Sequence, residues 1–175
     1  MKKINIQHGN RKAMLLVLLT VIPFSCGKVT FNMSGASIGN AKSCQVGYFE
    51  NRADIVNPRL STQITDALKD KIQASTSLKL VNSNADVMFE GEITGYTVQP
   101  QQVTATGTAA KDRLTVTVKV KFTNALEADN SFDKSFSRFQ EYAGGTSLSS
   151  VESTLVDDIL KELMEDIFNE AFSSW

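Results

Sequence analysis

The clearest pattern in the chain is an alternation of apolar and polar residues over positions 113–124. Threonine, lysine and arginine residues lie between the apolar ones, which are Leu114, Val116, Val118, Val120 and Phe122. Successive side chains point to opposite faces of a strand, so this segment has one apolar and one polar face. The pattern predicts a central strand of an antiparallel sheet with one face packed on a core.

Two other segments have the spacing of amphipathic helices. Asn57 and Pro58 mark the start of the first, whose apolar residues recur at helical spacing to about Ala74. In the second, Ser149 and Glu152 fit a capping box. Its apolar stripe consists of Val151, Leu155, Ile159, Leu163, Ile167 and Ala171, flanked by Val156, Leu160, Met164 and Phe168. Its opposite face is acidic, and we expect that face to be solvated.

Three more strands are predicted. Residues 42–51 alternate through Cys44, Val46 and Tyr48, which predicts a short strand with Cys44 in the core. Residues 85–98 form a long strand, in which a bulge is expected near one of its two glycines, Gly91 or Gly95. A polar hairpin loop is expected over 99–112, and residues 132–142 form the last strand.

The predicted order is strand, helix, strand, strand, strand, helix. A strand–helix–strand unit joins parallel strands, and short connections favour an antiparallel meander for the last three. The fold class is therefore α/β, of the α+β type: a two-layer sandwich in which a four-stranded mixed sheet has two helices on one face. We expect the other face of the sheet, which is polar and partly basic, to be free of intramolecular cover.

The first 25 residues resemble a secretory signal, in which basic residues precede an apolar run too short to span a bilayer. Cys26 follows the run as the cysteine of a lipoprotein lipobox does, although Pro23 departs from that pattern. We therefore expect residues 1–25 to be a lipoprotein signal peptide, residues 26–41 a lipidated tether, and residues 42–175 a single domain. The alternative is an ordinary signal peptide with an incidental cysteine.

The residue after Cys26 is Gly27, so no aspartate signals retention at the inner membrane. We expect a protein anchored by its acyl chains on the periplasmic side of the outer membrane. Without the four basic residues of the leader, 14 basic residues remain against 19 acidic ones. That balance argues against a nucleic-acid-binding protein.

Candidate catalytic chemistry is sparse. His8, in the leader, is the single histidine, so the mature chain cannot form a serine–histidine triad or a histidine metal site. Glu90 and Glu92 lie two residues apart and are candidates for an acid–base pair, but a solvated strand face explains them better. We expect no enzyme activity, no metal and no cofactor.

The polar face of the strand at 113–124 carries Arg113, Lys119 and Lys121. A row of cations on one face suits the recognition of phosphate or carboxylate groups. The alternative is a solvated face whose lysines discourage edge pairing.

Several segments, in order, resemble the LptE family of lipopolysaccharide-assembly lipoproteins. They are the lipobox cysteine, CQVGYFEN at 44–51, NPRLS at 57–61, DVMFEGEITGY at 86–96, RLT at 113–115 and DIFN at 166–169. The resemblance implies the same two-layer sandwich. It also implies a plug inside an LptD-like β-barrel, which the protein helps to assemble, and binding of lipopolysaccharide through basic sheet residues, here among Arg113, Lys119 and Lys121. The alternative from another class is a stand-alone periplasmic ligand-binding or transport-accessory lipoprotein.

Overall fold

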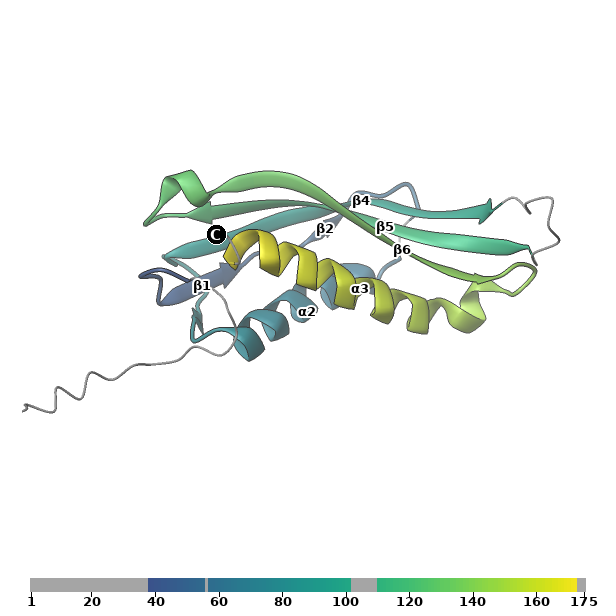
Figure 1. Ribbon diagram of the computed structural model, residues 1–175, viewed down its shortest axis with the longest axis horizontal. Helices are drawn as coiled ribbons and strands as arrows, with labels where there is room; N and C mark the ends of the chain where they lie inside the picture. The colour runs from purple at the N-terminus through teal and green to yellow at the C-terminus, as the bar shows by residue number, and fades with distance from the viewer. Residues whose placement is uncertain (1–37, 56, 102–109, 173–175) are drawn as a thin grey trace, which may run out of the picture. The chain divides into compact units, whose positions relative to one another are not determined.

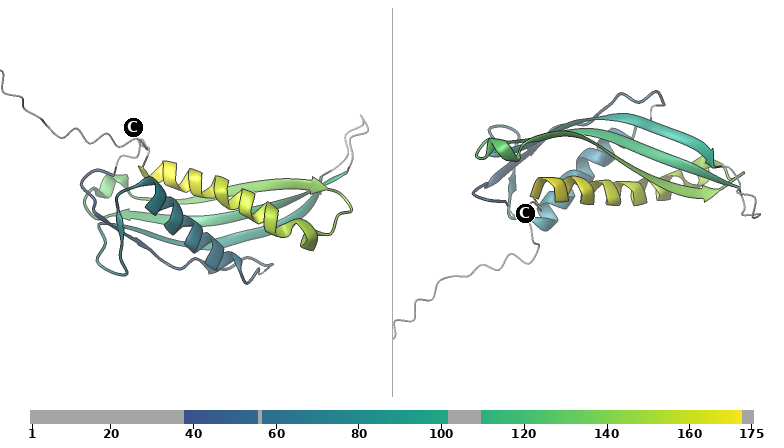
Figure 2. Two further views of the ribbon diagram at one scale, coloured as in Figure 1. Left: turned by 90° about the horizontal axis from the view of Figure 1, so that it is seen from below. Right: turned by 45° about the horizontal axis from the view of Figure 1, so that its top comes forward.

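The computed structural model describes residues 38–55, 57–101 and 110–172. The described elements are β1 (Ser43–Val46), β2 (Glu50–Asn51), α2 (Leu60–Ser75), β3 (Lys79–Leu80), β4 (Val87–Gln101), β5 (Lys111–Asn124), a short 3-10 helix (Ala128–Asn130), β6 (Phe132–Ala143) and α3 (Leu148–Phe172). The two helices lie side by side on one face of the sheet (Figures 1 and 2). The predicted two-layer α+β sandwich is confirmed.

The sheet runs in the order β3-β1-β4-β5-β6, and β2 also pairs with β4. β1 is parallel to β3 and β4, and β4, β5 and β6 form the predicted antiparallel meander. The sheet of the described residues has six strands rather than four, because the strand predicted over 42–51 is divided into β1 and β2, and because the two-residue strand β3 was not predicted. Strands this short have too few residues to show an alternation.

β4 and β5 are longer than predicted, and they continue to Gln101 and from Lys111 into the expected loop. The expected bulge is present, because the register of β4 against β5 shifts between Ile93 and Gly95. The shift returns Tyr96 to the buried face, where it is 3% exposed. An extra residue in one strand reverses the alternation beyond it, which explains why Tyr96 is out of phase with Ile93 in the sequence.

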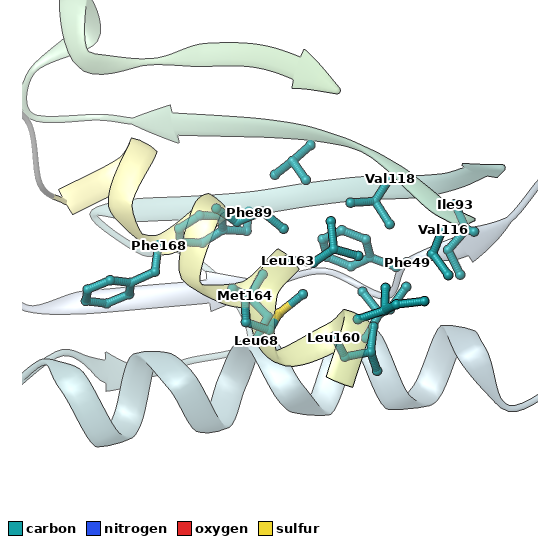
Figure 3. Close-up of a cluster of buried hydrophobic side chains, with 14 of the residues drawn as sticks. Phe49, Leu68, Phe89, Ile93, Val116, Val118, Leu160, Leu163, Met164 and Phe168 are labelled. Carbon is teal, nitrogen blue, oxygen red and sulfur yellow. The ribbon is translucent and has the colours of Figure 1, made fainter. Parts of the chain in front are cut away.

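The core lies between the sheet and the two helices (Figure 3). The apolar face of β5 is fully buried, with every one of its five apolar residues at or below 1% exposed. The apolar stripes of α2 and α3 face this side of the sheet, as predicted. Cys44 is also fully buried. Burial away from water raises the pKa of the Cys44 thiol to about 12, so this side chain behaves as a small apolar residue.

The acidic face of α3 is more than a solvated surface. The Arg138 guanidinium of β6 donates to both Asp166 carboxylate oxygens, at 2.5 and 2.6 Å. Lys134, on the same strand, donates to one carboxylate oxygen of Glu170, about one turn further along α3. Lys134 and Arg138 lie opposite the buried Val120 and Val116 of β5, so they point to the helix side of β6, the edge strand, and meet α3 there. The sequence pattern did not predict these contacts.

The start of α3 also differs from its prediction. Glu152 does not form a capping box with Ser149 and instead accepts hydrogen bonds from the Tyr96 hydroxyl and from the Asn57 amide, the latter at 3.1 Å. Burial, and then this carboxylate, raise the pKa of Tyr96. One carboxylate therefore joins β4, α3 and the loop that leads into α2.

Candidate functional site

The face of the sheet that points away from the helices, here called the outer face, carries the predicted basic residues. Each of them alternates along β5 with a buried apolar residue, and α2 and α3 both lie on the opposite side of the sheet (Figure 1). Lys119 is opposite Glu92 of β4 and Ser135 of β6, and Lys121 is opposite Glu90 and Asp133. Cross-strand neighbours of opposite charge therefore surround both lysines.

These ion pairs are long and exposed. Lys119 Nζ lies 3.3 Å from an Asp133 oxygen, and Lys121 Nζ lies 3.6 Å from a Glu90 oxygen. The four side chains are between 47% and 59% exposed. Such pairs contribute about 0–1 kcal/mol each, so a ligand can replace them at little cost to the fold.

Arg113 has different surroundings. Its Nη2 donates to Glu141 at 2.6 Å, and its guanidinium lies 4.0 Å over the ring of Phe139. Lys111 contacts the second oxygen of Glu141 at 3.1 Å. The hydrogen bonds from Arg113 and then Lys111 hold the pKa of Glu141 below its usual value.

The three predicted basic residues therefore lie in two separate sites on the outer face rather than in one. Lys119 and Lys121 are two residues apart on one face, whereas Arg113 is six residues from Lys119, or about 20 Å along the strand. The structure brings the two lysines together and separates Arg113 from them. Arg113 is held by Glu141 and Phe139 on β6, and its guanidinium is less open to a ligand.

A groove of about 440 Å³ lies beside the two lysines. Tyr48 and the backbone of Gly47 and Gly91 form its uncharged lining. Its charged lining residues are Glu50, Glu90, Glu92, Lys119, Lys121 and Asp133. The lysines are therefore part of a concave site of the size that small ligands occupy.

Tyr48 is the site residue that the sequence pattern misplaced. The alternation through Val46 predicts a buried Tyr48, yet its side chain is 61% exposed and Phe49 is fully buried. Val46 is opposite Phe89 and Glu50 is opposite Glu92, so four steps along this segment match three along β4. The extra residue reverses the alternation of buried and exposed side chains. Gly47, directly before Tyr48, is the one local sequence signal of this irregularity.

Local contacts hold this segment in place. The Gly47 amide donates to the Phe89 carbonyl at 2.8 Å, and the Phe49 amide donates to the Thr65 hydroxyl of α2 at 3.1 Å. The Phe49 ring fills the space over Gly91, where a side chain would collide with it. Tyr48 therefore projects from a backbone that is fixed on both sides.

Other sequence predictions fall outside this site. Cys26, the predicted lipid attachment residue, lies outside the described residues. Within the described ranges, no group of acidic, cysteine or histidine side chains has the arrangement of a metal site. None of the helices in those ranges has the length and apolar character that crossing a membrane requires.

Comparison with known proteins places the chain in a family. The sequence profile "LptE: Lipopolysaccharide-assembly" matches residues 41–171, which is most of the chain. A search of curated proteins finds no match. Among solved structures, a hypothetical protein from Chlamydia trachomatis shares the fold at 9% identity and a TM-score of 0.52, covering 74% of this chain and 97% of its own.

Two lipoproteins of known structure are also similar. A minor lipoprotein from Acinetobacter baumannii is 17% identical, with a TM-score of 0.45, and the match covers 74% of this chain and 90% of that one. The rare lipoprotein B from Shewanella oneidensis is 11% identical, with a TM-score of 0.42 and coverage of 73% and 89%. On the profile match over residues 41–171, the chain belongs to the LptE family of lipopolysaccharide-assembly proteins.

Proposed function

We propose that this chain is a non-enzymatic outer-membrane lipoprotein, anchored through Cys26, that works within lipopolysaccharide assembly as the plug of an LptD-like β-barrel. In this role it helps the barrel to assemble and assists the insertion of lipopolysaccharide into the outer membrane. Residues 1–25 are the signal peptide that is removed, 26–41 the lipidated tether, and 42–175 the plug domain. Family membership supports the general role in lipopolysaccharide assembly.

The observation that carries the plug proposal is the outer face of the sheet. Three long strands, β4, β5 and β6, present polar and paired charged side chains there, while both helices cover the opposite face. The lumen of a large outer-membrane barrel is itself polar and hydrated. An open polar sheet fits such a wall, because it needs no apolar partner surface.

Lys119 and Lys121 are the proposed lipopolysaccharide contacts, and Arg113 is a less accessible one. Phosphate groups are strong acceptors for ammonium groups, and the two lysines now make only weak pairs with Asp133 and Glu90. Glu90 serves here as an ion-pair partner, and so does Glu92, which lies 3.5 Å from Arg52. Neither carboxylate is proposed to be catalytic.

A pull-down tests the plug proposal. The chain, tagged at its carboxyl terminus, is extracted from membranes with detergent and purified by the tag. We expect a stoichiometric β-barrel partner of roughly 80–90 kDa, as a large barrel requires. If lipopolysaccharide co-purifies without a barrel, the stand-alone ligand-binding lipoprotein is the better description. Cys26→Ser, which removes the lipid attachment site, should release the protein from membranes.

Direct binding tests the contact residues. Lys119→Ala combined with Lys121→Ala should weaken lipopolysaccharide binding by roughly tenfold or more, since each lost charged hydrogen bond is worth about 1 kcal/mol or more. The matched control is Lys69→Ala with Lys161→Ala, which removes the same charge from the helical layer. Equal affinity of the wild type and the Lys119–Lys121 variant would refute the assignment.

A further inference from the structure

The groove beside Lys119 and Lys121 has a composition that a phosphate site alone does not explain. Its lining includes four carboxylates, Glu50, Glu90, Glu92 and Asp133, against the two lysines. Arg52, just outside the lining, lies 2.6 Å from Glu50 and 3.5 Å from Glu92 and offsets part of this charge. The lining has more carboxylates than basic groups, so the binding of phosphate by the two lysines does not account for the whole groove.

The carboxylates are better matched to hydroxyl groups. An ionised carboxylate only accepts hydrogen bonds and an ammonium group only donates them. A ligand with many hydroxyl groups can donate to Glu90, Glu92 and Asp133 and accept from Lys119 and Lys121 at the same time. The present ion pairs at 3.3 to 3.6 Å are weak enough to rearrange around such a ligand.

Tyr48 supplies the apolar part of the site. Its ring is 61% exposed, lines the groove, and is carried by a backbone that Phe49 and Gly47 hold fixed. An exposed ring with a polar tip, beside charged groups, presents a flat surface to a ligand with one apolar face and a polar edge. The C–H face and hydroxyl edge of a sugar ring have this combination.

We propose that this groove binds a sugar ring of a saccharide ligand, with the Tyr48 ring stacked on the sugar ring. The sugar hydroxyl groups donate hydrogen bonds to the carboxylates, and the sugar oxygens accept hydrogen bonds from the lysines. A volume of about 440 Å³ accommodates one or two sugar rings. The inference rests on the proposed role in lipopolysaccharide handling and deepens it, because it assigns the saccharide, rather than phosphate alone, to this groove.

The test uses an oligosaccharide without phosphate or lipid. Core oligosaccharide is released from lipopolysaccharide by mild acid and dephosphorylated, and its binding to the full mature chain in detergent is measured by calorimetry. Saturation-transfer NMR then reports which sugar protons lie closest to the protein, and the comparison with Tyr48→Ala shows which of these contacts depend on the Tyr48 ring. We expect the wild type to bind, Tyr48→Phe to bind similarly, and Tyr48→Ala to bind about tenfold more weakly.

The matched control is Phe139→Ala, which removes another exposed ring from the same outer face, away from the groove. It should leave oligosaccharide affinity unchanged. Tyr48 is largely exposed, so circular dichroism and the unfolding midpoint of Tyr48→Ala should match the wild type.

Two results would overturn the inference. One is a wild type that binds intact lipopolysaccharide but not the phosphate-free oligosaccharide, which leaves the proposed function standing and removes the sugar site. The other is an affinity for the oligosaccharide that Tyr48→Ala does not change. A wild type that binds neither the oligosaccharide nor intact lipopolysaccharide would instead count against the proposed function itself.

Discussion

Gly91 is the position where a single added carbon should do most damage, and it connects the core to the groove. It lies on the buried face of β4 between Phe89 and Ile93 and also lines the groove. A Cβ built on Gly91 would lie 2.3 Å from the Phe49 ring and 2.7 Å from the backbone oxygen of Lys119. We predict that Gly91→Ala destabilises the fold and displaces the segment that carries Tyr48.

The size of the effect follows from these contacts. Phe49 is fully buried in the core shown in Figure 3, so its ring has no open space to enter. The second collision is with the backbone of the neighbouring strand, which can move only by disturbing the pairing of β4 and β5. Overpacking of this kind costs about 1–3 kcal/mol of unfolding free energy, and the backbone contact places Gly91→Ala at the upper end of that range.

Urea unfolding followed by circular dichroism measures this cost as a shift of the midpoint at unchanged slope. Gly95→Ala is the matched control, because a Cβ there would lie 3.2 Å from the Thr117 side chain and 3.9 Å from its backbone nitrogen, with no contact as short as those at Gly91. Gly95 is half-buried, and we expect this control to cost clearly less than Gly91→Ala, because the Thr117 side chain has to shift by only a few tenths of an ångström. A Gly91→Ala protein as stable as Gly95→Ala would show that Phe49 and the backbone of β5 can move aside at little cost, and would refute the prediction. Phe49→Leu should restore part of the loss when combined with Gly91→Ala.

Two further predictions concern buried and paired polar groups. Tyr96→Phe removes the hydroxyl that donates to Glu152 and should lower the unfolding free energy by about 1.5–3 kcal/mol, as measured in urea, since the lost hydrogen bond is to a charged group. The Asp86 carboxylate accepts from the amides of Lys42 and Ser43 at 2.8 and 3.0 Å, and these bonds, with the Ser43 hydroxyl, lower its pKa. Its contribution to stability is therefore complete above the unfolded pKa of about 3.9 and is lost as the pH falls through the lower folded pKa. Asp86→Asn should flatten stability over this acidic window, and an unchanged pH profile would contradict the assignment.

The fold class could be read from local periodicity because each long element buries one face. The alternation of β5 and the stripe of α3 predicted which residues are buried, since a face turned to water for ten or more residues leaves a clear pattern. The two-residue strand β3 leaves no such pattern. The partners of polar side chains were also hidden, because Arg138 and Asp166 are 28 residues apart and meet only when β6 becomes the edge strand.

The candidate site divides in the same way. The basic residues of β5 could be found from the sequence because they share a face of one strand, yet their separation into a lysine pair and a distant Arg113 depends on neighbours from β4 and β6. Asp133 and Glu50 join the groove only through pairing between strands.

The sequence by itself determined the two-layer arrangement, the polar outer face and the lysines on it, because hydrophobic burial at periods of two and 3.6 is a local property. Tertiary structure decided that Tyr48 is exposed and Phe49 is buried. The alternation of 42–51 reverses because β1 and β2 both pair with β4 and the segment between them has one residue more than the matching part of β4. The space that receives the Phe49 ring exists because Gly91, beside it, has no side chain. Register between strands depends on the whole sheet, so no reading of one segment could have placed the ring of Tyr48 in the groove.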